Sequence, residues 1–191
     1  MEKPCIRKKK LVIVGDSGSG KTCLLASFSK EEFPTIEVPA VLDTFVINIE
    51  VEGKVTVELE LCDTAGQEGN GKLRQLLYPD TDVVLLVFAI NSRDSLKNIT
   101  KNWNPELKHF CNDRRKVLVG TKKDLRCVAE EKANVDVSPE KGRLMAERIG
   151  AFAYIECSAK NKEGVQEVLE TAARAAVLGP RCVRRRGCQI I

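Results

Sequence analysis

Several features that mark whole classes of protein are missing from this 191-residue chain. Its longest apolar run, VVLLVFAI at 83–90, is far short of the roughly 20 residues that a membrane-spanning helix needs. The eight cysteines contain no C-x-x-C spacing, so neither a zinc site nor a redox motif is indicated. The first residues, MEKPCIRKKK, are too charged for a signal peptide. These absences favour a reducing, cytosolic setting in which most cysteines are buried free thiols.

The positive charge is concentrated at one end of the chain. Residues 181–191 carry four arginines and no acid, so they account for the whole net charge of +4 and leave residues 1–180 balanced. A nucleic-acid-binding core would normally show a clustered basic stripe. We therefore expect no nucleic acid partner, and we expect the basic tail to meet an anionic surface.

Apolar runs alternate with helix-length segments along the chain, which is the pattern of an α/β protein. The run at 55–62 alternates apolar and polar residues and pairs with 45–51 as an antiparallel hairpin near a sheet edge. Ser138 and Pro139 predict a helix start, and the apolar positions of 164–178 lie on one helix face. We predict a doubly wound, six-stranded, mostly parallel sheet with about five helices in one domain at 1–180, followed by the tail at 181–191. The predicted strands are 10–14, 45–51, 55–62, 83–90, 116–121 and 153–157.

A glycine-rich motif joins the first predicted strand to the first helix. G-x-x-x-x-G-K-S/T is matched by Gly15, Asp16, Ser17, Gly18, Ser19, Gly20, Lys21 and Thr22, with Cys23 next in the helix. Small residues let the backbone wrap around phosphates with its N–H groups pointing inward. Lys21 would reach the β- and γ-phosphates, and the Thr22 hydroxyl would ligate Mg²⁺. The segment is a P-loop, which predicts a nucleotide site without naming the base.

Three further motifs follow predicted strands and specify the nucleotide. In Asp63-Thr64-Ala65-Gly66-Gln67, Asp63 would hold the Mg²⁺ shell, Gly66 would meet a γ-phosphate, and Gln67 would orient the attacking water. In Thr121-Lys122-Lys123-Asp124, the Asp124 carboxylate can accept two bonds from guanine that adenine does not offer. Ser158-Ala159-Lys160 can add a backbone N–H to guanine O6. Together they predict GTP or GDP with Mg²⁺.

In this order, these four motifs resemble the Ras superfamily of small GTP-binding proteins. Segments such as KTCLL, LYPDTDVVLLVF, PELKHFC, KKDLR and ECSAK look most like the Rho family. That resemblance implies a switch between GTP and GDP that acts on effectors of the actin cytoskeleton, with exchange factors and GTPase-activating proteins as partners. It also implies that Phe33 stacks near the guanine and that Lys122 packs along the base. Trp103 and His109 are expected to be structural, since neither lies near a nucleotide motif in the sequence.

The chain departs from the family pattern in its switch segments. Ala40 stands where the family has a threonine that ligates Mg²⁺ and closes the first switch loop, and Glu37 replaces a tyrosine. Thr44 is no substitute, because four extended residues place it up to about 13 Å further on. The sequence GNG at 69–71 replaces a bulkier stretch and makes the second switch loop costlier to order. These changes predict a weakened trigger.

The chain ends as a C-a-a-X box, Cys188-Gln189-Ile190-Ile191, after RCVRRRG. Cys188 is the expected prenylation site, with geranylgeranyl favoured over farnesyl. The arginines would add roughly 1 kcal/mol each on an anionic membrane, and Cys182 could carry a palmitoyl chain. We expect the protein on the cytoplasmic face of membranes, the plasma membrane in particular, and in the cytosol.

Three functions compete for this sequence. The leading one is a membrane-anchored, slow GTP hydrolase whose arginine finger comes from a partner. Gln67 favours it, whereas Ala40 favours a GTP-binding interaction protein with little hydrolysis. A P-loop kinase is disfavoured by the combination of the DTAGQ and TKKD motifs.

Overall fold

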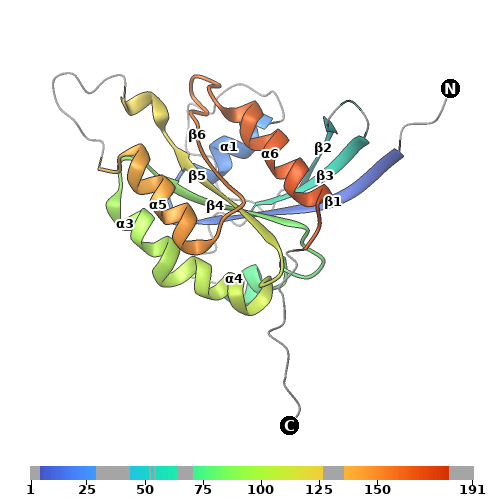
Figure 1. Cartoon of the computed structure of the whole chain (residues 1–191), viewed down its shortest axis with the longest axis horizontal. Coiled ribbons are helices and arrows are strands. Elements are labelled where there is room, and N and C mark those ends of the chain that lie inside the picture. The colour runs from blue at the N-terminus through green and yellow to red at the C-terminus, as the bar shows by residue number, and fades with distance from the viewer. Residues whose placement is uncertain are drawn as a thin grey trace, which may run out of the picture.

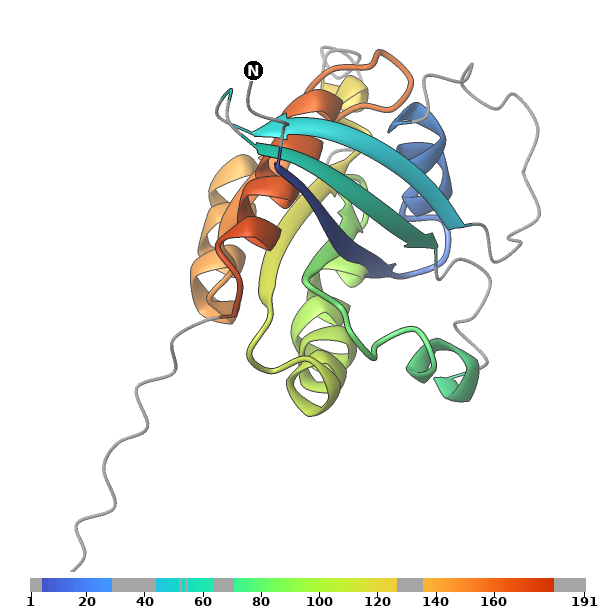
Figure 2. The same cartoon turned by 90° about the vertical axis from the view of Figure 1, so that its right-hand side faces the viewer.

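The computed structural model describes residues 5–28, 44–51, 53, 55–63, 71–126 and 136–180. Six strands form one sheet in the order β2-β3-β1-β4-β5-β6, in which only the β2–β3 pair is antiparallel. This confirms the predicted six-stranded, mostly parallel α/β fold. Figure 2 shows β2 at the edge of the sheet beside β3, as the hairpin pattern predicted. The strands are β1 (Cys5–Gly15), β2 (Thr44–Val51), β3 (Val55–Asp63), β4 (Val83–Ala89), β5 (Arg115–Thr121) and β6 (Ala153–Glu156).

The first strand starts at Cys5, five residues before the apolar run that predicted it. Its charged first half forms a strand because β3 runs alongside from Val55 and supplies backbone partners. Lys8 pairs with Glu58 at 3.1 Å, and Lys9 pairs with Asp82 at 2.8 Å. The predicted start was wrong because these residues lack an apolar run and depend on a neighbouring strand.

Helices cover both faces of the sheet (Figure 1). On one face, α1 (Lys21–Phe28) and α6 (Val165–Val177) pack on the sheet in one buried apolar cluster. On the other face, α3 (Arg93–Asn98), η1 (Ile99–Trp103), α4 (Asn104–Phe110) and α5 (Pro139–Ile149) contribute to a second cluster. The short elements α2 (Gly71–Gln75) and η2 (Lys123–Arg126) complete the described helices. None of the helices in these segments has the length and apolar character required to cross a membrane.

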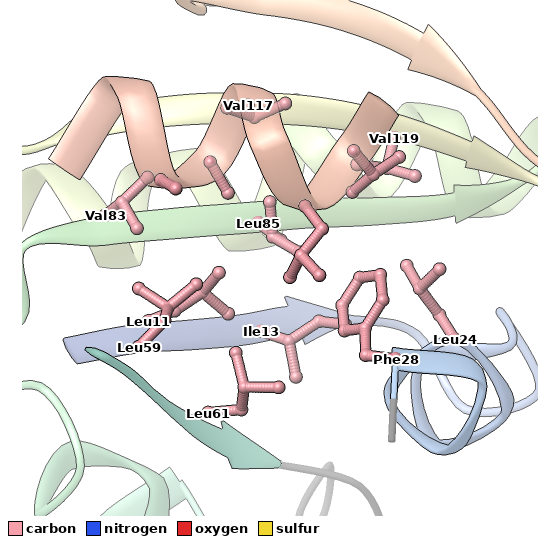
Figure 3. Packing of buried hydrophobic residues seen from close by; sticks show 14 of the residues in the cluster. Leu11, Ile13, Leu24, Phe28, Leu59, Leu61, Val83, Leu85, Val117 and Val119 are labelled. Carbon is pink, nitrogen blue, oxygen red and sulfur yellow. The ribbon is translucent and has the colours of Figure 1, made fainter. Parts of the chain in front are cut away.

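Strands buried on both faces form the centre of the molecule. Every residue of β4 is buried, and alternate side chains of β1 point into opposite clusters. Figure 3 shows Leu11 and Ile13 of β1 with Leu85 of β4 in the cluster that α1 and α6 cover. The apolar side chains of these strands are buried on both faces of the sheet, so the polar residues that follow them in the sequence lie at the ends of the strands.

Local signals account for the ends of α5. The Ser138 hydroxyl accepts a hydrogen bond from the backbone N–H of Lys141, and Pro139 occupies the first turn, as predicted. At the other end, Gly150 adopts a left-handed conformation with φ of 62°. This helix packs beside the strands that carry the third and fourth motifs.

Candidate functional site

Four segments that the sequence singles out meet at one edge of the sheet. The P-loop follows β1, Asp63 ends β3, Thr121 ends β5, and Ser158 follows β6 closely. The parallel register pairs Ile13 with Asp63 and Gly120 with Glu156, so these strands end together. Ligands of open α/β sheets bind outside the carboxyl ends of the strands.

The glycines of the P-loop are required by its geometry. A Cβ at Gly15 would lie 2.1 Å from the carbonyl oxygen of Val87 in β4, so a larger residue would push the loop off the sheet. Gly18 and Gly20 have φ of 69° and 87°, which L side chains rarely adopt. The loop therefore lies close against β4 and turns directly into α1.

The Lys21 ammonium is held by the loop itself. Only 4% of Lys21 is exposed, and its Nζ donates hydrogen bonds of 2.7 Å to the carbonyl oxygens of Gly15 and Asp16. Ser19 donates its backbone N–H to the same Asp16 carbonyl at 3.2 Å. The charge on Lys21 is thus fixed inside the loop whose backbone would surround phosphates.

The two predicted magnesium ligands are in contact. The Thr22 hydroxyl donates a hydrogen bond of 2.9 Å to Oδ2 of Asp63, which is 3% exposed. Mg²⁺ prefers oxygen ligands and is commonly held by one or two protein groups together with substrate phosphates and water. The described residues contain no group of three or more potential metal-ligating His, Cys, Asp or Glu side chains. Thr22 and Asp63 would therefore hold the ion, which would neutralise phosphate charge when bound.

A cavity of about 190 Å³ lies beside the P-loop, where the two motifs that are predicted to read the base converge. Ser158, fully buried, donates a hydrogen bond of 2.6 Å to Oδ1 of Asp124. The same hydroxyl accepts the backbone N–H of Asn161 at 3.1 Å, so its direction is set. The cavity is lined by Gly20, Cys23, Thr121, Lys122, Asp124, Leu125, Ala159 and Lys160.

The backbone at Lys122, which lines this cavity, is in the left-handed conformation. Lys122 has φ of 63°, an uncommon value for a residue other than glycine. The turn is held by hydrogen bonds from Lys123 N to Cys157 O at 3.0 Å and from Leu125 N to Lys122 O at 3.0 Å. Thr121 joins the turn to the P-loop, since its hydroxyl hydrogen-bonds the carbonyl of Ser19. In this conformation Lys122 lines the cavity.

The thiols near the site are not activated. Burial raises the pKa of Cys23, although the positive charge of Lys122 opposes that shift. Burial likewise raises the pKa of Cys157 to about 12. Four of the cysteines, Cys23, Cys62, Cys111 and Cys157, are free thiols, and the last three of them are buried, as the sequence predicted for most of the cysteines. Leu125, which no motif marked, lines the cavity because it follows Asp124 in η2.

Trp103, which was expected to be structural because it is far from the nucleotide motifs in the sequence, contacts one of those motifs in the fold. Its indole Nε1 donates a hydrogen bond of 2.6 Å to Oδ1 of the P-loop residue Asp16. Asn98 donates to Oδ2 of the same carboxylate at 2.7 Å. A separation of more than 80 residues hid this contact from motif reading. His109, by contrast, packs edge-on against Phe110, with ring centroids 4.6 Å apart.

Several predicted residues lie outside the described part of the chain. These are Phe33, Gly66 and Gln67 of the nucleotide site, the switch residues Glu37 and Ala40, and the lipidation cysteine Cys188. Their assigned roles remain predictions from the sequence.

The placement of the P-loop, the Thr22–Asp63 pair and the Asp124 cavity along one sheet edge agrees with a comparison against protein families. The model of the Ras family matches residues 10–178, which include all the described helices and all of the sheet except the first five residues of β1. The chain therefore belongs to the Ras family and is a small GTP-binding protein.

Proposed function

We propose that this protein is a membrane-anchored molecular switch of the Rho type, which alternates between GTP and GDP and acts on effectors that organise actin. The observation that carries the switch is the contact between Thr22 and Asp63. It joins the P-loop to the end of β3, where the DTAGQ segment begins. A metal ion held there would connect the bound phosphates to the chain that follows β3.

The Rho assignment is supported by the sequence segments that resemble that branch and by the basic, cysteine-containing tail. KTCLL opens α1, PELKHFC lies in α4 and just beyond it, and ECSAK begins at the last residue of β6. The effectors, the actin connection and the regulators follow from that resemblance.

We infer that hydrolysis is slow without a partner. Gln67 would orient water, but transition-state charge also needs a cation such as an arginine finger. Arg74 is bound by Glu106 at 2.8 Å, and Arg126 is bound by Glu156 at 2.6 Å. These described arginines already serve structural ion pairs, which favours a finger supplied by a partner protein.

Single-turnover GTP hydrolysis tests two claims together, that the protein hydrolyses GTP and that it belongs to the Rho branch. The reaction is measured alone, with a Rho-activating protein and with a Ras-activating protein at equal concentrations. We expect slow basal turnover and strong stimulation by the Rho-activating protein alone. Stimulation only by the Ras-activating protein would reject the Rho assignment while leaving the GTPase intact.

The membrane anchor is proposed to be a prenyl group on Cys188, assisted by Arg184, Arg185 and Arg186. Cell fractionation of the full chain and of Cys188→Ser tests this. The variant should move to the soluble fraction, whereas replacing the three arginines by glutamine should weaken binding most at low salt. A Cys188→Ser protein that stays equally membrane-bound would place the anchor elsewhere.

A second function is favoured by Ala40, which keeps a backbone N–H but removes a metal-ligating hydroxyl. In this alternative, the protein binds GTP as an interaction partner and hydrolyses little, because the first switch loop stays mostly open. Effector affinity would fall with the closed fraction. Ala40→Thr should then raise effector binding and partner-stimulated hydrolysis together, with a smaller change in GDP affinity. If neither activity changes, Ala40 is not the limiting difference.

A further inference from the structure

The Asp16 side chain points away from the lysine of its own loop and toward the helices on the opposite face of the sheet from α1. Its two carboxylate oxygens accept one hydrogen bond each, from Trp103 at 2.6 Å and from Asn98 at 2.7 Å. Both donors are neutral, and both distances are in the short range typical of bonds to charged acceptors. The P-loop is therefore held by side chains that no nucleotide-binding motif contains.

The unusual helical register of η1 brings these two donors to one side. In an α-helix, residues five apart differ by about 140° around the axis, so Asn98 and Trp103 would diverge. The segment from Ile99 to Trp103 is instead a π-helix, whose i→i+5 bonds bring such residues into line. The backbone N–H of Asn104 bonds to Ile99 O in this register. The π-helical segment thus allows Asn98 and Trp103, five residues apart in one continuous helix, to donate to the same carboxylate.

The backbone of Asp16 transmits this anchoring to Lys21. While its carboxylate is held by η1 and the end of α3, its carbonyl oxygen accepts hydrogen bonds from Lys21 Nζ and from Ser19 N. A backbone rotation of residue 16 that reoriented this carbonyl would also pull the carboxylate away from Trp103 and Asn98, so the two side-chain bonds oppose it. The position of the Lys21 charge therefore depends on the contacts of Asp16 with η1.

The indole that makes one of these contacts is itself fixed. The Arg74 guanidinium lies 4.8 Å from the Trp103 ring centroid, and Glu106 holds it through bonds of 2.8 Å to both Nε and Nη2. Trp103 is only 6% exposed. Its N–H is thus presented to Asp16 in one orientation.

The Asp16 side chain has room to move if these bonds are lost. A cavity of about 520 Å³ adjoins it, lined by Asp16, Ser17, Arg74, Asn102, Trp103 and Glu106. Close packing alone would not keep the carboxylate in its observed position. The two hydrogen bonds select that position.

We propose that Trp103, together with Asn98, is a positioning residue for the P-loop: it fixes Asp16 so that the Asp16 carbonyl directs Lys21 and the Asp16 carboxylate stays turned toward η1. Loss of the contact would release a negative charge beside a phosphate-binding loop and loosen its essential cation. This role depends on the guanine nucleotide binding of the family and is independent of the proposed branch, effectors and membrane anchor.

A double-mutant cycle on nucleotide release tests the proposal. Release of fluorescent GDP and single-turnover GTP hydrolysis are measured for wild type, Trp103→Phe, Asn98→Ala, Asp16→Ala and the two double variants with Asp16→Ala. We expect GDP release to accelerate about tenfold in Trp103→Phe and about fivefold in Asn98→Ala, with slower hydrolysis in both. In the Asp16→Ala background, either substitution should add little, because its acceptor is gone.

The matched control is Asn102→Ala, an asparagine of the same π-helix that lines the same cavity. Across the described residues, no hydrogen bond joins it to Asp16, so its GDP release should stay at the wild-type rate. Equal acceleration by Trp103→Phe with and without Asp16 would show that the indole acts through packing and would overturn the proposal. Unchanged release in Asn98→Ala would overturn it as well, even if Trp103→Phe failed to fold. Wild-type GDP binding, measured first, separates this outcome from a failure of the nucleotide assignment.

Discussion

Ser158 donates a hydrogen bond of 2.6 Å to the carboxylate of Asp124, from a loop 34 residues further along the chain. The bond occupies one oxygen of the group that is predicted to read guanine. Because Ser158 is fully buried, no water can easily replace its hydroxyl. The Asp124 carboxylate is therefore held in place by a residue of a second motif.

We expect Ser158→Ala to lower GDP affinity about tenfold, because Asp124 loses a charge-assisted bond that orients it. Competition with fluorescent GDP measures the change. Ser27→Ala is the control, since among the described residues the Ser27 hydroxyl bonds to Leu24 O within α1. Wild-type affinity in Ser158→Ala would mean that Asp124 is positioned by other contacts.

Asp124→Asn should shift base preference from guanine toward xanthine, because an amide can donate where the carboxylate can only accept. Displacement of bound nucleotide by GTP, xanthosine triphosphate and ATP measures that preference. In the wild type, ATP should not compete. Equal displacement of GDP by ATP and GTP would refute the role of Asp124 in reading the base.

Thr22→Ala should make nucleotide release less dependent on magnesium, because the variant lacks one of the two predicted oxygen ligands, which lie 2.9 Å apart. Chelation of Mg²⁺ should accelerate GDP release strongly in wild type and only slightly in the variant, whose basal release should be about tenfold faster. Thr100→Ala is the control, since it also removes a threonine hydroxyl, but one whose exposed hydrogen bond goes to Lys97 O. An equal response to chelator in Thr22→Ala and wild type would exclude the predicted metal site.

Gly142→Ala should destabilise the fold, although the same change in most helices stabilises it by up to about 1 kcal/mol. The new Cβ would lie 2.1 Å from Cζ of Tyr154. That ring stacks on Phe88 and its hydroxyl bonds to Glu156, so it cannot retreat freely. We expect the free energy of unfolding to fall by about 1–3 kcal/mol in denaturant titration.

Gly71→Ala provides the comparison for Gly142→Ala, because among the described residues the nearest neighbour of the new Cβ would be the Arg74 side chain at 3.7 Å. That variant should be as stable as wild type or slightly more stable. If Gly142→Ala behaves in the same way, Tyr154 accommodates the methyl group and the packing argument fails.

Glu106 should make the fold sensitive to acid. Burial acts to raise its pKa, but hydrogen bonds from Arg74 and Tyr78 and the Arg74 charge together lower it below the usual 4.5. A lowered folded-state pKa gives stability that is present above the unfolded value and is lost as pH falls through the folded value. Unfolding measured from pH 7 to pH 3 should therefore show stability declining below about pH 4.5.

Glu106→Gln should reduce that decline and should also lower stability at pH 7 by about 1–3 kcal/mol, since Arg74 loses its ionic partner. Glu147→Gln, which changes an exposed carboxylate of α5, should follow the wild-type curve. The same acid dependence in Glu106→Gln and wild type would show that other carboxylates control it.

The sequence by itself determined the features that local patterns can carry. Apolar runs predicted the six strands, the P-loop spacing predicted the turn into α1, and Ser138 with Pro139 predicted the start of α5. These signals work because backbone conformation and burial on a nearby face depend on neighbouring residues. The placement of motifs at strand ends then predicted a shared sheet edge.

Only the tertiary structure decided which distant side chains meet. The charged start of β1 forms a strand because β3 lies beside it, and Gly142 is required because the Tyr154 ring occupies the adjacent space. The Trp103 indole donates a hydrogen bond to Asp16 because η1 adopts a π-helical register and packs on the sheet beside the P-loop. Such contacts depend on the positions of whole elements, which a local residue pattern does not encode.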